Sequence, residues 1–271
     1  MTKLNLLVLA LLCCGFITSM AQNDKHITVS EEPTDDGVIL YIENIGVCPY
    51  TVEFDAELTN VRADKALPMS IVVPAGMRME LLRLEPKPNA RWGYRYNFNY
   101  YMGDAFNARH DGLYVYQLPY EKGASFVVGQ GYNGDFSHRG EKALDFVMPV
   151  GTPVHAAREG MVIKVRSDSN RGCGSESCRD DGNYLLILHS DGSIANYAHF
   201  KHRGVAVKEG EVVAQGQLIG YSGNTGWSSG PHLHFQVYVP GLGNKRNSVA
   251  TYFRTASSES VLLREKQSYK W

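Results

Sequence analysis

Short apolar runs separated by turn residues recur along most of the chain, and several alternate apolar with polar positions. In residues 94–100, aromatic side chains occupy every second position with Arg and Asn between them, and residues 232–239 alternate in the same way. Residues 183–189 and 194–200 flank a Ser-Asp-Gly-Ser turn at 190–193. A strand places every second side chain on one face, and Asp-Gly between apolar runs is a strong hairpin signal. The pattern therefore predicts an all-β protein rich in antiparallel strands.

The distribution of apolar runs and turn residues along the chain predicts two folded regions joined by a connector. Residues 22–105 contain short apolar runs with turn signals between them, which is typical of a small β-sandwich serving as an accessory domain. Residues 106–123 are expected to form the connector. Residues 124–271 carry better marked strands and are expected to form the second domain and its C-terminal tail. The aromatic stripe of residues 94–100 is expected to pack in the sandwich core, with a surface for stacking on sugar rings as the alternative.

Residues 1–21 are predicted to be a secretory signal peptide. A positive start precedes the apolar residues 6–17, and small residues at the two positions read by a signal peptidase predict cleavage after Ala21. The apolar run is too short to span a bilayer, so we expect no stable membrane span. The mature chain is thus expected in the periplasm or outside the cell. Cys13 and Cys14 leave lipoprotein anchoring as an alternative, although neither follows the Gly or Ala typical of lipidation.

Composition and cysteine spacing narrow the picture further. Lys and Arg number 27 against 28 Asp and Glu, so there is no basic excess and we expect no nucleic-acid binding. Hydrophobic residues at 44% and charged residues at 20% exclude wholesale disorder and a coiled coil. Cys173 and Cys178 lie in a polar, Gly-rich loop, which in an exported protein predicts a disulfide. A metal half-site is the alternative, but the spacing is wider than C-x₂-C. Cys48 is expected to be a buried thiol.

Three segments carry residue types suited to chemistry. His232 and His234 share one face of their predicted strand, whose other face is apolar. Asp145 stands among apolar residues, and a buried carboxylate is usually paired or bound to a metal. Tyr197 and His199 are expected to share one face of a third strand. Two histidines and a carboxylate form a usual zinc set with an open fourth position. A surface histidine pair and an ordinary salt bridge are the plain alternatives.

These segments resemble the lysostaphin-type (LytM-like) zinc metallopeptidases, which cut peptide bonds in bacterial cell-wall peptidoglycan. The resemblance covers residues 129–239. Its motifs are His138 with Asp145, G-T-P-V-H-A-A-R-E-G at 151–160, Y-A-H at 197–199, G-Q-L-I-G at 216–220, S-G-N-T-G at 222–226 and H-L-H at 232–234. For the fold, the resemblance implies an antiparallel β-sheet domain with an open groove, of the duplicated hybrid motif type.

The resemblance also implies a role for each residue. His138, Asp145 and His234 become the expected ligands of a Zn²⁺ ion. His199 and His232 become the catalytic histidines that position or deprotonate the attacking water and stabilise the oxyanion. Because the metal supplies the activated water, no Ser or Cys nucleophile is needed.

Two further motif residues, Tyr197 and Asn224, are predicted to contact the peptide substrate. The sequence departs from the family in one place. The family usually spaces the first His and the Asp as H-x₃-D, whereas His138 and Asp145 stand as H-x₆-D. Glu141, four residues before Asp145, is therefore an alternative ligand. We favour His138, because a short loop insertion can still return it to the site.

The leading hypothesis is an exported zinc endopeptidase that acts on the peptides of peptidoglycan. One alternative is a catalytically silent family member that binds the wall or activates a separate hydrolase, but no implied ligand is missing. Another is a cupin-like metal oxygenase, since two His and a carboxylate on a β-scaffold also describe iron sites. A cupin would normally show a Glu soon after H-x-H, and residues 235–240 have none. The other histidines are expected at the surface or in loops: His26, His110, His155, His189 and His202.

Overall fold

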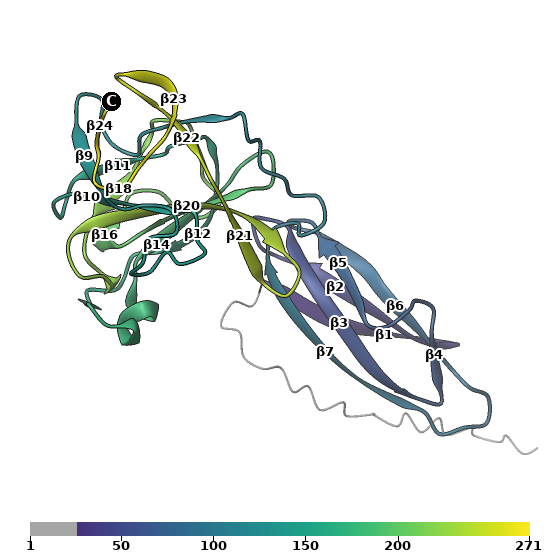
Figure 1. Ribbon diagram of the computed structural model, residues 1–271. Helices are drawn as coiled ribbons and strands as arrows, with labels where there is room; N and C mark the ends of the chain where they lie inside the picture. The colour runs from purple at the N-terminus through teal and green to yellow at the C-terminus, as the bar shows by residue number, and fades with distance from the viewer. Residues whose placement is uncertain (1–25) are drawn as a thin grey trace, which may run out of the picture. The chain divides into compact units, whose positions relative to one another are not determined.

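The computed structural model describes residues 26–271, and their regular secondary structure is almost entirely β-strand (Figure 1). Within this range the helical content is the 3₁₀ turn η1 (Glu176–Asp181). The prediction of an all-β protein is therefore confirmed. The predicted signal peptide, with Cys13 and Cys14, lies outside the described residues. None of the helical structure in residues 26–271 is long and apolar enough to cross a bilayer.

The described chain divides into two compact units. The N-terminal unit comprises residues 26–46 and 52–100, and the C-terminal unit comprises residues 47–51 and 101–271. The N-terminal unit contains two sheets. One has the order β1 (Ile27–Thr34), β2 (Gly37–Asn44), β6 (Arg78–Pro86) and β4 (Val61–Ala63), and the other has the order β5 (Met69–Val73), β3 (Tyr50–Thr59) and β7 (Gly93–Met102).

The aromatic stripe lies on β7, and its alternate side chains are less exposed than the Arg and Asn residues between them. The ring of Tyr96 stacks on the buried ring of Phe54 with centroids 5.5 Å apart, and the Tyr94 hydroxyl donates a hydrogen bond to Glu31 at 2.7 Å. These contacts favour packing inside the N-terminal unit over a surface for sugar rings.

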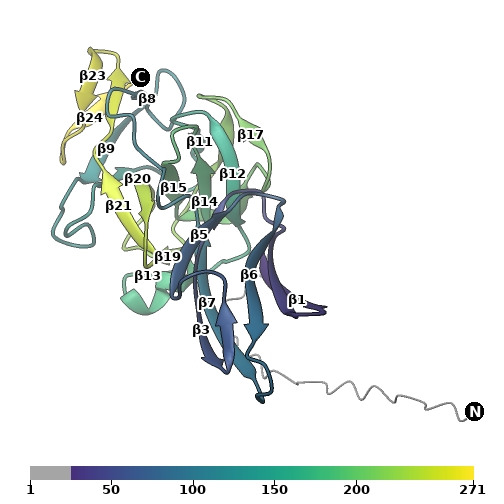
Figure 2. The same cartoon turned by 90° about the vertical axis from the view of Figure 1, so that its right-hand side faces the viewer.

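The C-terminal unit is built on one large antiparallel sheet. Figure 2 shows its strands β12, β14, β15 and β20 in the C-terminal unit. The full order is β17 (Val212–Val213), β12 (Gly160–Arg166), β14 (Tyr184–Leu188), β15 (Ile194–Ala198), β20 (His232–Gly241), β10 (Ala143–Val147), β9 (Ser125–Gln130) and β24 (Ser268–Lys270), with β21 (Lys245–Val249) also paired to β20. Strand β20 therefore has hydrogen-bonded neighbours on both sides.

Smaller sheets complete this unit. They are β11 (Pro153–His155), β18 (Leu218–Ser222) and β16 (Phe200–Val205); β13 (Gly172–Cys173) and β19 (Gly226–Trp227); and β23 (Ser258–Leu262), β22 (Tyr252–Thr255) and β8 (Val115–Gln117). Strand β8 lies within residues 106–123, the stretch expected to be a connector. Tyr116 and Tyr120 of this stretch are about 1% exposed or less, so it contributes to the hydrophobic core.

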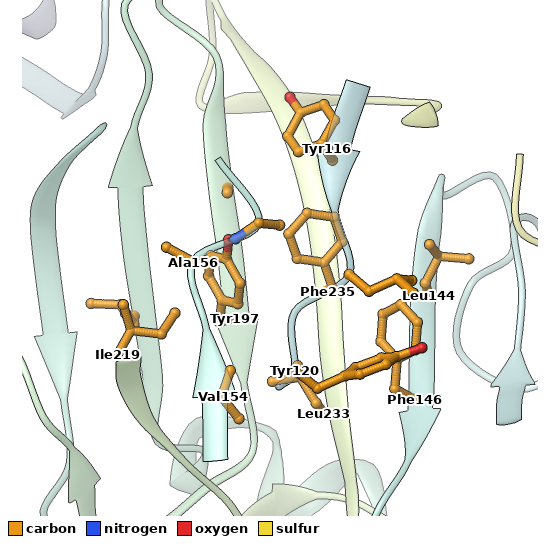
Figure 3. Packing of buried hydrophobic residues seen from close by; sticks show 14 of the residues in the cluster. Tyr116, Tyr120, Leu144, Phe146, Val154, Ala156, Tyr197, Ile219, Leu233 and Phe235 are labelled. Atoms are coloured by element: carbon orange, nitrogen blue, oxygen red, sulfur yellow. The ribbon is translucent and has the colours of Figure 1, made fainter. Parts of the chain in front are cut away.

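The core of the C-terminal unit forms on one face of the large sheet. Figure 3 shows Leu233 and Phe235 of β20 beside Phe146 of β10, with Val154 and Ile219 from the β11–β18 sheet in the same cluster. All five side chains are 1% exposed or less. Burial of each such side chain contributes roughly 1.5–3 kcal/mol. Because residues alternate along a strand, this packing leaves the other face of β10 and β20 for polar side chains.

Candidate metal centre

Three adjacent strands bring the polar residues together. Asp145 on β10 lies directly opposite His234 on β20, and Ala198 on β15 lies opposite His234 from the other side. Since Leu233 and Phe235 are buried in the core, His232 and His234 point away from it. The alternation that the sequence predicts for this strand is therefore present. It places both imidazoles on the face that carries Asp145.

The carboxylate of Asp145 is the centre of this group. Its Oδ1 atom lies 3.0 Å from His234 Nδ1, 3.3 Å from His138 Nε2 and 3.7 Å from His232 Nε2. Possible ligand atoms of His138, Asp145 and His234 all lie within 4.8 Å of one another. Among the His, Cys, Asp and Glu side chains of residues 26–271, these three lie close enough together to bind one metal ion.

The surroundings of His138 fit a metal ligand. The side chain is 2% exposed, and its Nδ1 lies 3.0 Å from the carbonyl oxygen of Gly131. A carbonyl can only accept, so Nδ1 carries the proton and Nε2 remains for another partner. Nε2 is buried and makes no well-aligned hydrogen bond. A ligating His typically has its second nitrogen held by a carbonyl in this way. Two nitrogens and one carboxylate thus fit a divalent cation such as zinc.

Electrostatic attraction links the Asp145 carboxylate to the histidines around it. Burial by itself would raise the pKa of Asp145, but the nearby His138 and His234 outweigh it and hold that pKa well below its usual range. Burial lowers the pKa of His138, but the Asp145 carboxylate and backbone hydrogen bonds with Gly131 and Ala143 together raise it by more. A cation binds these ligand atoms in their unprotonated form, so its binding would release any proton that they carry.

A second histidine pair stands beside this group. The ring centroids of His199 and His232 are 4.5 Å apart. His199 Nδ1 lies 2.6 Å from the carbonyl oxygen of Thr225, and His232 Nδ1 lies 2.8 Å from that of Gly230 and 3.1 Å from Ser228 Oγ. Both rings are therefore held through Nδ1, which leaves Nε2 as the available nitrogen. Burial, reinforced by the two neighbouring histidines, lowers the pKa of His199 to about 3, so its ring is neutral at neutral pH.

These side chains open onto a groove of about 710 Å³. Asp145, His199, His232 and His234 line it, whereas His138 is not part of the lining. Further residues of the lining are Gln130, Asp135, Phe136, Val147 and Trp227. The groove thus exposes an acidic oxygen and imidazoles to a bound molecule while keeping His138 beneath its surface.

Comparison with known protein families gives a direct assignment for this region. The model of peptidase family M23 matches residues 139–249, which include Asp145, His199, His232 and His234 and begin one residue after His138. Residues 139–249 are a peptidase family M23 domain.

Two curated relatives illustrate the similarity. Peptidoglycan DD-endopeptidase ShyC of Vibrio cholerae is 42% identical over 113 residues, covering 42% of this chain and 23% of that protein. Lysostaphin of Staphylococcus simulans is 35% identical over 127 residues, covering 46% of this chain and 23% of that protein. The chain thus spans less than a quarter of the length of these curated relatives. The solved catalytic domain of lysostaphin matches with 31% identity and a TM-score of 0.34, over 46% of this chain and 87% of that domain.

The structure corrects the prediction for Tyr197. Tyr197 is 0% exposed, packs against Phe235 with ring centroids 5.1 Å apart, and accepts a hydrogen bond from the backbone N–H of Ala157 (Figure 3). The expected sharing of a face with His199 is wrong because His199 has a left-handed backbone with φ of 68°, which breaks the strand alternation after Ala198. Because its side chain has no exposed surface, the structure favours a role for Tyr197 in the core over the predicted contact with substrate.

Asn224 and Glu141 lie apart from the metal group. Asn224 is exposed but does not line the groove, and its Oδ1 accepts a hydrogen bond from Ser228 Oγ at 2.6 Å. Its link to the site runs through Ser228, which contacts His232. The Glu141 carboxylate accepts a hydrogen bond from Gln236 Nε2 at 2.7 Å and is not in the three-residue group that contains His138. The geometry therefore favours His138 over Glu141 as a ligand.

His189 lies in a loop, as expected, but it is buried. It follows strand β14 and is only 3% exposed. Its Nδ1 donates to the carbonyl oxygen of Glu159 at 2.7 Å. Burial lowers the pKa of His189 to about 4. No motif signalled this position, because a polar residue after a strand is ordinarily solvated.

The disulfide loop contacts the segment that holds His199 and His232. In the structure Cys173 and Cys178 are disulfide-bonded, and strand β13 pairs in parallel with β19. Gly226 N–H donates to Arg171 O at 2.9 Å, and Ser228 N–H donates to Cys173 O at 3.0 Å. The loop thereby contacts the segment whose Thr225 and Ser228 hold His199 and His232. Cys48 is buried as expected, and burial raises the pKa of its thiol to about 12.

Proposed function

We propose that this protein is a zinc endopeptidase that hydrolyses peptide bonds in bacterial peptidoglycan. The observation that carries the proposal is the meeting of His138, Asp145 and His234 beside a second histidine pair, within a domain of family M23. Relatives named as peptidoglycan DD-endopeptidase and lysostaphin support peptidoglycan peptide as the substrate. His138, Asp145 and His234 would hold the zinc ion.

Each residue around the groove has a distinct task in this proposal. Zinc, when bound, would lower the pKa of a water ligand towards ~7 and polarise the scissile carbonyl. His199 is neutral at neutral pH, so its Nε2 can accept a proton from the attacking water. His232 Nε2 lies 3.7 Å from Asp145 Oδ1, and as an imidazolium, with both ring nitrogens protonated, His232 can donate a hydrogen bond from Nε2 to the oxygen on which charge develops. Thr225 and Ser228 keep both rings in orientation through Nδ1.

Single substitutions distinguish the ligands from the catalytic histidines. His234→Ala and His138→Ala should lose both zinc and activity, because one of three protein ligands is gone. His232→Ala and His199→Ala should keep zinc and lose roughly 10²–10⁴-fold in rate. Glu141→Ala is the matched control in the same loop and should keep both properties.

The measurement is zinc content by elemental analysis beside digestion of purified peptidoglycans of different cross-bridges, with mass spectrometry of the fragments. A zinc-free His232→Ala or Glu141→Ala protein would overturn the assignment of roles. Iron in the purified protein with oxygen-dependent turnover would contradict the peptidase itself. Zinc-loaded protein that binds peptidoglycan but releases no fragment would point to a silent family member.

We also propose that the chain acts outside the cytoplasm, in the periplasm or beyond the cell. Its proposed substrate lies there, and residues 1–21 have the composition of a secretory signal. A disulfide between Cys173 and Cys178 is compatible with an oxidising compartment. Fractionation of cells that make the protein, followed by blotting, tests this location, and protein retained in the cytoplasm would contradict it.

A further inference from the structure

The loop that carries His138 is closed on itself. It joins β9, which ends at Gln130, to β10, which begins at Ala143. Within it Asn133 N–H donates to Glu141 O at 2.8 Å, and Glu141 N–H donates to His138 O at 2.8 Å. These bonds give the loop a defined shape, but they do not join it to Asp145. Besides His138 itself, one side-chain contact joins the loop to the Asp145 carboxylate.

The side-chain amide of Gln130 makes that contact. Its Oε1 accepts from the backbone N–H groups of Phe136 at 3.0 Å and Ser137 at 3.1 Å. Its Nε2 donates to Ser137 Oγ at 2.8 Å and to Asp145 Oδ2 at 3.0 Å. A glutamine amide offers two donor hydrogens and two acceptor lone pairs, and all four are used here. One side chain thus joins the His138 loop to the Asp145 carboxylate.

The strand register places Gln130 where it can do this. Gln130 lies directly opposite Asp145 on the neighbouring strand β9, and the register shifts immediately afterwards, between Asp145 and Phe146. Paired residues of adjacent strands point to the same face, and a bulge re-aims the side chains beside it. The Gln130 side chain therefore lies next to the loop, on the same face of the sheet as the Asp145 carboxylate.

We propose that Gln130 is a positioning residue that holds Asp145 and the His138 loop together for metal binding. This inference rests on the proposed metal centre. Asp145 Oδ1 faces His138 and His234, while Oδ2 accepts from Gln130. The amide thereby fixes the rotation of the carboxylate and leaves Oδ1 directed at the histidines. It also accounts for how His138 reaches Asp145 across the longer H-x₆-D spacing, because Gln130 fastens the loop just ahead of His138.

Gly134 leaves space in the loop for the Gln130 side chain, because it has no Cβ atom. A Cβ atom on Gly134 would lie 2.4 Å from Gln130 Cγ and 3.0 Å from its Oε1, far inside van der Waals contact. Gly134→Ala should therefore displace Gln130 or lift the loop. Either movement weakens the link to Asp145, which gives a second way to test the inference without changing Gln130.

The test measures zinc affinity of the full chain by competition with a chelator, and stability of the metal-free protein by thermal unfolding. Gln130→Leu should bind zinc about 10–100-fold more weakly, the range typical for loss of a group that orients a ligand. Gln215→Leu is the matched control. Gln215 is also partly buried, and its Nε2 donates to Ala157 O at 3.0 Å and to Tyr114 Oη at 3.1 Å, both outside the His138 loop. It should leave zinc affinity within twofold.

Gln130→Glu separates the contact with the loop backbone from the contact with Asp145. Its carboxylate can still accept from the N–H groups of Phe136 and Ser137, but it has no hydrogen to donate to Asp145. Hydrogen exchange should therefore show both amides protected as in the wild type, while zinc binds more weakly. Gly134→Ala should also weaken zinc binding, and Gly112→Ala, where a Cβ meets nothing within 4 Å, should not.

Each outcome decides one question. If the wild type binds no zinc, the proposed metal centre fails and Gln130 is not the cause. If the wild type binds zinc and Gln130→Leu binds it within twofold, the positioning role is refuted. If Gln130→Leu and Gln215→Leu lose affinity and metal-free stability alike, Gln130 contributes only to general folding and the proposal is overturned.

Discussion

Replacing Tyr197 by Phe tests whether this motif residue serves the core or the groove. The hydroxyl accepts the backbone N–H of Ala157 at 2.8 Å, and both residues are 0% exposed. Tyr197→Phe keeps the ring against Phe235 and removes only the acceptor. The N–H of Ala157 would then be buried without a partner, since water does not reach it. We expect the free energy of unfolding to fall while the groove stays unchanged.

The magnitude follows from the desolvation of one amide. An unsatisfied buried N–H costs about 1–3 kcal/mol. For a domain of this size each kcal/mol lowers the melting temperature by roughly 2–4 °C, so Tyr197→Phe should melt about 2–12 °C below the wild type. Tyr252→Phe is the control, because Tyr252 is 39% exposed and surface changes stay within about 0.5 kcal/mol.

The assay combines differential scanning calorimetry with the rate of peptidoglycan digestion per bound zinc ion. We expect Tyr197→Phe to lose stability and keep its rate at temperatures below the transition. The reasoning would be refuted by the reverse result. Unchanged stability with a reduced rate would mean that the hydroxyl meets the substrate, as the motif alone suggested, and that its contact with Ala157 is dispensable.

Three further predictions concern other parts of the chain. Replacing Cys173 and Cys178 together by Ser should leave zinc bound and lower turnover by up to ~10²-fold, because small displacements of catalytic groups are costly; mass mapping of the unreduced wild type should show the two cysteines linked. Burial lowers the pKa of His189 from 6.5 to about 4, so only the unfolded chain takes up this proton between those pH values, and stability should fall by up to about 3 kcal/mol on acidification. His189→Asn should remove that part of the loss in denaturation curves at pH 7 and pH 4. N-terminal sequencing of exported protein should begin at Gln22, and an intact Met1 would exclude cleavage.

Where the backbone is regular, the sequence was sufficient to predict which face of a strand each side chain occupies. His232 and His234 share a face because β20 runs without interruption, so period-two reasoning holds for it. The same reasoning failed one strand away. At His199 the backbone turns left-handed, so the side chain reaches the groove although Tyr197, two residues earlier, lies in the core. A left-handed residue other than Gly leaves no reliable trace in a single sequence.

Contacts between distant segments were beyond the sequence for a different reason. Gln130 has an ordinary position at the end of a strand, and only the register with β10 places its amide next to Asp145. His189 gave no warning of burial, because the residues that cover it come from elsewhere in the chain. The sequence showed that the spacing between His138 and Asp145 is unusual. Whether His138 reaches Asp145 depended on how the loop between β9 and β10 folds, which the sequence did not show.

The central position of β20 has a consequence for the order of folding and metal binding. This strand carries His232 and His234 and is hydrogen-bonded along both edges, to β10 and β15. Opening it requires disruption of the large sheet itself, so its histidines are set in place by folding and not by the ion. The domain in this respect differs from small zinc modules, whose unfolded apo chains fold only around metal. We therefore expect metal to enter the proposed site after folding and reversibly, so that a chain stripped by a chelator keeps the scaffold to which zinc can return.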